Sequence, residues 1–143
     1  MHLSYEATAG GFVDDATNYL TDGTTSAVPI QTETINQNWD DLFQVMNPLS
    51  GQDADLIFCS ANTRSTADPE ILQSVGLISG HAYSILQMKV SKTNGLHYIQ
   101  IRNPWGNTEW NGGWSDKSAL WTTDLKVEIL IHEDEDSGRF WMV

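Results

Sequence analysis

The sequence predicts an α+β fold in which an antiparallel sheet carries a few peripheral helices. Two apolar segments, 82–90 (AYSILQMKV) and 96–102 (LHYIQIR), are rich in β-branched and aromatic residues and flank a Lys-Thr-Asn-Gly turn, which is the pattern of a β-hairpin. Shorter apolar segments at 55–61 and 139–143 predict two further strands. A chain of 143 residues can bury a sizeable core, so a single domain over residues 1–143 is expected.

The N-terminal third is predicted to contain one helix. Residues 1–33 carry little hydrophobic periodicity, and glycines and small polar residues interrupt them, which favours loops. The clearest helix lies over 35–46 and ends before Pro48. Its apolar residues recur at helical spacing and are expected to pack into the core: Ile35, Trp39, Leu42, Phe43 and Met46.

Cys59 lies inside the predicted strand 55–61, between Phe58 and Ser60. A reactive cysteine needs an electropositive, partly open position such as a helix N-terminus. A cysteine within a strand is more often a small buried hydrophobic residue, so Cys59 is expected to be structural. Because it is the sole cysteine, it cannot form an internal disulfide, which is typical of a reducing compartment.

The segments between the strands contain shorter elements. Asp68-Pro69 can start one or two helical turns that end at Gly76. Thr123 or Asp124 can cap a short helix that ends at Ile129, although the segment VEILI equally suits a strand. Four tryptophans lie in the loop after the hairpin, and most of them are expected to pack as a second, smaller core: Trp110, Trp114 and Trp121. Trp105 is the expected exception.

Composition excludes several classes of function. Lys and Arg number 7 against 19 Asp and Glu, for a net charge of −12, which disfavours binding to nucleic acid or to an anionic membrane surface. No apolar run approaches the roughly 20 residues of a membrane helix, and no signal peptide opens the chain. We therefore expect an intracellular, cytoplasmic protein with no nucleic-acid or membrane partner.

The two outer ends of the predicted hairpin carry chemically useful side chains. His81 precedes the first strand and Asn103 follows the second, so the hairpin could bring them together. A tight two-residue Asn94-Gly95 turn would instead place His81 opposite Thr108, so a meeting requires a wider connection or a bulge. An imidazole oriented by an amide is two thirds of a Cys-His-Asn catalytic group.

Several ordered motifs resemble the second, His- and Asn-bearing half of the calpain protease core. The resemblance implies the antiparallel-sheet half of a papain-like cysteine protease. It also implies that His81 is the general base, that Asn103 orients its ring, and that Trp105 lines the substrate cleft. The motifs are SYEATAGG at 4–11, GHAYS at 80–84, RNPWG at 102–106, EWNGGWSD at 109–116 and FWM at 140–142.

The resemblance implies part of a calpain-like cysteine endopeptidase that acts on proteins or peptides. The nucleophilic cysteine is then expected in a preceding subdomain that is absent from this chain, so the chain alone is expected to hydrolyse nothing. The alternative is a non-catalytic regulatory or binding module that keeps the protease fold. A Cys-Trp pair at a helix start upstream, preceded by a suitable Gln, would favour the protease.

The resemblance also implies one calcium ion in this half of the core. Glu109 and Asp116 match two carboxylate ligands, and Asp136 supplies a third if one residue is inserted before Phe-Trp-Met. Arg139 stands where the family has an acid. Since calcium takes six to eight oxygen ligands, calcium binding is possible but expected to be weak or absent. Zinc is not expected, because no cysteine pair exists and the histidines are scattered.

Overall fold

The chain folds as two compact units, Met1–Asp40 and Asp41–Val143. Helix α2 (Ile35–Met46) crosses the boundary between them. Within the described residues, no helix is long and apolar enough to cross a membrane. The computed structural model describes residues 10–30, 32–47, 57–60, 68–131 and 137–143.

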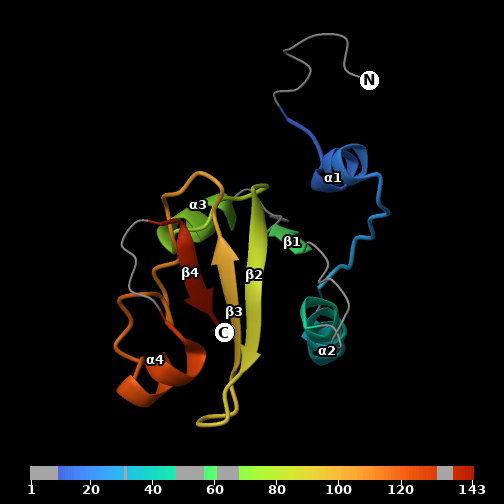
Figure 1. Ribbon diagram of the computed structural model, residues 1–143. Helices are drawn as coiled ribbons and strands as arrows, with labels where there is room; N and C mark the ends of the chain where they lie inside the picture. The colour runs from blue at the N-terminus through green and yellow to red at the C-terminus, as the bar shows by residue number, and fades with distance from the viewer. Residues whose placement is uncertain (1–9, 31, 48–56, 61–67, 132–136) are drawn as a thin grey trace. The chain divides into compact units, whose positions relative to one another are not determined.

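The second unit is built on a four-stranded sheet in the order β1-β2-β3-β4, and each strand pairs antiparallel with the next. Figure 1 shows the strands side by side in this order. The predicted antiparallel sheet and the α+β class are therefore confirmed. The strands are β1 (Ile57–Ser60), β2 (Ala82–Val90), β3 (His97–Arg102) and β4 (Arg139–Met142).

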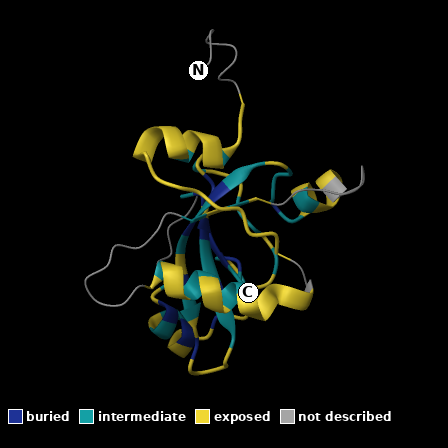
Figure 2. Cartoon of the chain, turned by 90° about the vertical axis from the view of Figure 1, so that its right-hand side faces the viewer, coloured by how far each residue is buried: buried dark blue, intermediate teal, exposed yellow. Residues whose placement is uncertain are grey.

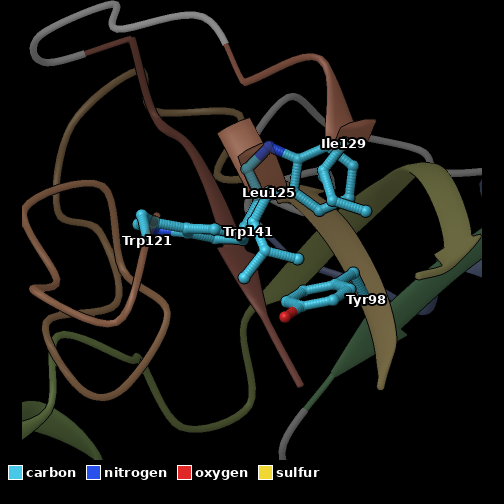
Figure 3. Close-up of a cluster of buried hydrophobic side chains, with 5 residues drawn as sticks. All are labelled: Tyr98, Trp121, Leu125, Ile129 and Trp141. Atoms are coloured by element: carbon cyan, nitrogen blue, oxygen red, sulfur yellow. The ribbon is translucent and has the colours of Figure 1, made fainter. Parts of the chain in front are cut away.

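Helix α4 (Thr123–Ile129) covers one face of the sheet. The Thr122 hydroxyl accepts a hydrogen bond from the backbone N–H of Leu125 at 3.3 Å, so the cap lies one residue before the predicted Thr123. Figure 3 shows strand and helix side chains converging on one cluster. The cluster contains Tyr98, Trp121, Leu125, Ile129 and Trp141, with Trp114 packed against it.

The opposite face of the sheet carries a second cluster. Neighbouring side chains of a strand point to opposite faces, so Phe140 lies in this cluster while Trp141 lies in the first. Cys59 and Trp110 pack against the edge of the second cluster. Figure 2 shows the buried segments concentrated in the strands. The buried members of this second cluster are Tyr83, Ile101 and Phe140.

The connection between β2 and β3 is wide, and the pairing is irregular. Val90 pairs with His97, so the connection runs over residues 91–96 rather than two residues. The register also shifts between Ile85 and Gln87. A meeting of His81 with Asn103 would need a wider connection or a bulge. The hairpin has both.

Contacts from α4 hold this connection. The carboxylate of Glu128 accepts hydrogen bonds from the Ser91 hydroxyl at 2.9 Å and from the backbone N–H of Lys92. The Ser91 hydroxyl in turn accepts from the backbone N–H groups of Thr93 and Asn94 at 3.1 and 3.3 Å. Hydrogen bonds within the loop are thus supplemented by a residue more than thirty positions further along the chain.

The remaining helices depart in part from the predictions. Helix α3 (Asp68–Ser74) lies where the Asp68-Pro69 start predicts it. Helix α1 (Val13–Thr21) corrects the expectation of loops over 1–33. Asp14 and Asp15 favour its first turn by complementing the helix dipole. None of its residues is buried.

Helix α2 has its predicted bounds, but the core packing expected of its apolar face is wrong. No residue of α2 is buried, and Ile35 is 52% exposed. Trp39, Leu42, Phe43 and Met46 are half-buried and belong to neither of the two buried clusters. A short 3₁₀ turn, η2 (Thr32–Thr34), precedes the helix.

Candidate active site

His81 and Asn103 meet at one end of the hairpin. His81 lies directly before β2 and Asn103 directly after β3, and the Nε2 atom of His81 is 2.9 Å from the Oδ1 atom of Asn103. Their separation in sequence is 22 positions. The antiparallel pairing of β2 with β3 is what brings these two residues to the same end of the sheet.

The Asn103 side chain is fully buried, and its orientation is fixed by its partners. Its Nδ2 group donates to the carbonyl oxygens of Asn107 at 2.6 Å and Thr108 at 3.1 Å. Its Oδ1 atom accepts from the backbone N–H of Trp105 at 3.1 Å. Because the amide nitrogen faces two carbonyls, the atom that faces His81 must be the oxygen.

This arrangement selects one tautomer of the histidine. The Asn103 oxygen can only accept, so the Nε2 atom of His81 must carry the hydrogen. In a neutral imidazole, the Nδ1 atom then holds a free lone pair and can accept a proton. The site therefore presents an oriented base.

The sequence Asn-Pro-Trp-Gly builds much of this geometry locally. The N–H of Gly106 donates to the carbonyl of Asn103 at 3.0 Å, closing a four-residue turn with Pro104 in its second position, which proline favours. The hydrogen bond from the Trp105 N–H to the Asn103 side chain adds an Asx turn on the same residues. One of the two carbonyls that accept from the Asn103 amide belongs to Thr108, whose backbone is left-handed with φ of 60°.

Two aromatic rings contact the imidazole of His81. The Trp105 ring lies with its centroid 4.5 Å away, tilted by 53°, and this tryptophan is 64% exposed. The Tyr83 ring lies 4.9 Å away in a T-shaped arrangement and is buried. His81 itself is half-buried. Sequence reasoning missed Tyr83, although its position two residues after His81 indicates a shared face of the strand.

The sole cysteine of the sequence is not placed as a nucleophile. Cys59 pairs with Tyr83 across β1 and β2. Burial raises the pKa of its thiol to about 11, so the thiolate is scarce near neutral pH. This environment agrees with the expected structural role of Cys59.

Two of the three carboxylates predicted to bind calcium, Glu109 and Asp116, lie close enough to influence each other. Burial, and then the neighbouring Glu109 carboxylate, raise the pKa of Asp116 to about 6. The Oε1 atom of Glu109 accepts a hydrogen bond from the backbone N–H of Gly138 at 2.7 Å. Asp136 lies outside the described residues, and within them no group of three metal-binding side chains occurs. Two carboxylates supply only part of a calcium coordination shell.

Comparisons with known proteins agree with one another. A family model described as calpain family cysteine protease matches residues 1–143. Calpain-9 of Homo sapiens is 36% identical over 143 residues, which cover 97% of this chain and 20% of that protein. Calpain-type cysteine protease DEK1 of Zea mays is 37% identical over 149 residues, which cover 99% of this chain and 6% of that protein. The calpain-2 catalytic subunit of Mus musculus is 32% identical over 141 residues, which cover 96% of this chain and 19% of that protein. The chain thus spans a fifth or less of the length of these relatives.

Proposed function

The chain belongs to the calpain family of cysteine proteases, and we propose that it supplies the base and its orienting amide to a calpain-like cysteine endopeptidase. The observation that carries the proposal is the 2.9 Å contact between His81 Nε2 and Asn103 Oδ1, with the amide orientation fixed by its other partners. Oriented imidazole bases of this kind activate thiol nucleophiles.

The proposed chemistry uses the free Nδ1 atom of His81. It takes the proton of a cysteine thiol, and the sulfur attacks the scissile carbonyl of a protein or peptide substrate. The resulting imidazolium keeps its Nε2 hydrogen bond to Asn103 and later donates the Nδ1 proton to the leaving amine. In the second step, the same imidazole takes a proton from water, and the water oxygen attacks the acyl-enzyme and releases the cysteine. Trp105 lines the cleft beside the reacting groups.

The nucleophile in this proposal comes from a Cys-bearing subdomain that acts as the partner of this chain. Cys59 is unsuited to the role, since its thiol pKa is about 11. We further propose an intracellular, cytoplasmic setting, which the absence of any cysteine pair in the sequence supports. The net charge of −12 argues against nucleic acids and anionic membranes as partners.

Calcium binding in this half is proposed to be weak. Glu109 and Asp116 would hold the ion, which would supply a positive charge that neutralises both carboxylates. The proposed weakness is supported by the engagement of Glu109 with the Gly138 backbone and by the cationic Arg139 near the same turn.

The test of the proposed function uses the intact parent enzyme with the variants His81→Ala and Asn103→Ala. Removing the base should lower kcat by about 10²–10⁴-fold or more, and removing the amide should lower it by a smaller factor. His97→Ala, at the start of β3, is the matched control and should retain activity. Normal turnover in His81→Ala would instead favour the non-catalytic module.

Asn103→Ala needs a second measurement, because Asn103 is buried. The variant leaves the carbonyls of Asn107 and Thr108 without their donor, at a cost of about 1–3 kcal/mol. Urea unfolding of the same variant separates this loss of stability from a loss of catalysis. Asn111→Ala is the control, since Asn111 is exposed and its amide donates to the Ser74 carbonyl.

A further inference from the structure

Tyr83 contacts His81 through its ring and contacts the segment that leads into His81 through its hydroxyl. The ring is T-shaped against the imidazole, with centroids 4.9 Å apart. The hydroxyl oxygen accepts a 2.9 Å hydrogen bond from the backbone N–H of Ile78. Tyr83 is only 3% exposed, so packing against Ile101 and Phe140 holds it in place.

The hydrogen bond from Ile78 to Tyr83 lies where the chain turns into β2. Gly80, directly before His81, has φ of +65°, so the backbone changes direction immediately before the histidine. The bond from Ile78 to the Tyr83 hydroxyl joins the two sides of this turn. A residue rigidly seated in the sheet therefore fixes the backbone on which His81 is carried.

Tyr83 remains neutral in this position. Burial is the main cause that raises the pKa of its hydroxyl, and the hydrogen bond from Ile78 opposes it in part. The neutral phenol contributes no charge to the imidazole, so its influence on His81 is through position.

We propose that Tyr83 is a positioning residue that holds the imidazole of His81 in register with Asn103. Asn103 selects the tautomer, and Tyr83 fixes where the ring lies, so that the Nδ1 atom is presented at a constant place. The catalytic consequence rests on the proposed function, whereas the positioning itself is measurable in the chain without catalysis.

The test is Tyr83→Phe in the 143-residue chain, since phenylalanine keeps the ring and removes only the hydroxyl. Tyr98→Phe is the matched control. Tyr98 is also buried in the sheet, and its hydroxyl accepts from Asn94 at 2.8 Å, in the other cluster. The readout is ¹⁵N NMR of His81, which reports the tautomer and the exchange of the Nε2 hydrogen with water.

Tyr83→Phe should accelerate exchange of the His81 Nε2 hydrogen about fivefold, which is the change in open population expected from losing one hydrogen bond. Tyr98→Phe should leave this exchange unchanged at matched global stability. The proposal is overturned if Tyr83→Phe leaves the exchange unchanged, or if both variants accelerate it equally.

A second arm measures kinetics in the parent enzyme. Tyr83→Phe should lower kcat with KM unchanged, because the base is misplaced while substrate contacts remain. An NMR effect without any change in kcat would support the positioning and overturn the catalytic consequence proposed for Tyr83, while the role of His81 is tested separately by His81→Ala. A change in KM alone would overturn the proposed catalytic consequence of Tyr83.

Discussion

The backbone N–H of Asn103 donates a 2.7 Å hydrogen bond to the carbonyl of Gly138, which joins the buried amide of the site to the start of β4. Gly138 has φ of +73°, and a Cβ at this position would lie 2.7 Å from the Asn103 carbonyl oxygen. Its own N–H donates to Glu109. The Gly138 peptide thus lies between a candidate calcium ligand and the candidate catalytic amide.

Gly138→Ala should therefore destabilise the fold in two ways. A left-handed alanine costs about 1–2 kcal/mol, and the backbone shift forced by the close contact adds about 1–3 kcal/mol. Gly95→Ala is the control, because Gly95 has φ of +71° but nothing within 4 Å of an added Cβ. Urea unfolding should show the larger loss for Gly138→Ala. Equal losses would contradict the close approach of Gly138 to Asn103.

The isolated chain should not hydrolyse peptide bonds. His81 and Asn103 provide a base and its orienting group, but a base without a thiolate has no nucleophile to activate. Casein or a fluorogenic peptide at high protein concentration provides the measurement. Turnover that disappears in Cys59→Ala would show that Cys59 is the nucleophile and that its buried environment opens.

Cys59 should react slowly with iodoacetamide in the folded chain. Its pKa is raised by burial from the ordinary 9.0 to about 11, so the thiolate fraction at pH 8 falls about hundredfold. The rate should rise as the pH approaches 11 and should rise at pH 8 when urea unfolds the chain. A folded chain that reacts as fast as the unfolded one would rule out the buried thiol.

Asp116 should make the fold less stable as the pH rises. Burial and the Glu109 charge raise its pKa from 3.8 to about 6, so the folded state holds the proton more tightly than the unfolded state. Stability from this group is complete below about pH 4 and is lost as the pH rises through 6. Asp116→Asn should then raise the melting temperature at pH 7.5 and not at pH 4.

The control for this experiment is Asp124→Asn, the same chemical change at an exposed site. Asp124 lies in the first turn of α4, where a negative charge favours the helix, so this variant should lose about 0.3–1 kcal/mol. A gain of the same size in both variants would show that overall net charge, and not burial of Asp116, sets the effect.

Calcium should bind weakly or not at all to the isolated chain. Only two of the predicted carboxylates lie in the described part, and Glu109 is already hydrogen-bonded to Gly138. Titration calorimetry at moderate salt is suitable, because salt screens diffuse attraction to the net charge of −12 while a built site persists. A stoichiometric micromolar site that is lost in Glu109→Ala would contradict this prediction.

The sequence by itself determined the elements that a local residue pattern identifies. Alternation and β-branched residues predict the strands, and the spacing of apolar residues predicts the bounds of α2. The Asn103-Pro104-Trp105-Gly106 turn is also local, because its bonds join residues two and three positions apart. The sequence could therefore identify His81 and Asn103 as candidate site residues. It could also show that the two meet only if the connection between the strands is wide or bulged.

The tertiary structure decided whether that condition is met. The wide loop over 91–96 is closed by bonds of its own and is held in addition by Glu128, which reaches Ser91 from α4, 37 positions away. The backbone N–H of Asn103 likewise depends on the carbonyl of Gly138, 35 positions away. Partners of this kind are set by how the helix and strands pack, and packing has no periodicity that a single sequence displays. The sequence names the side chains that carry the chemistry, and long-range hydrogen bonds fix their register.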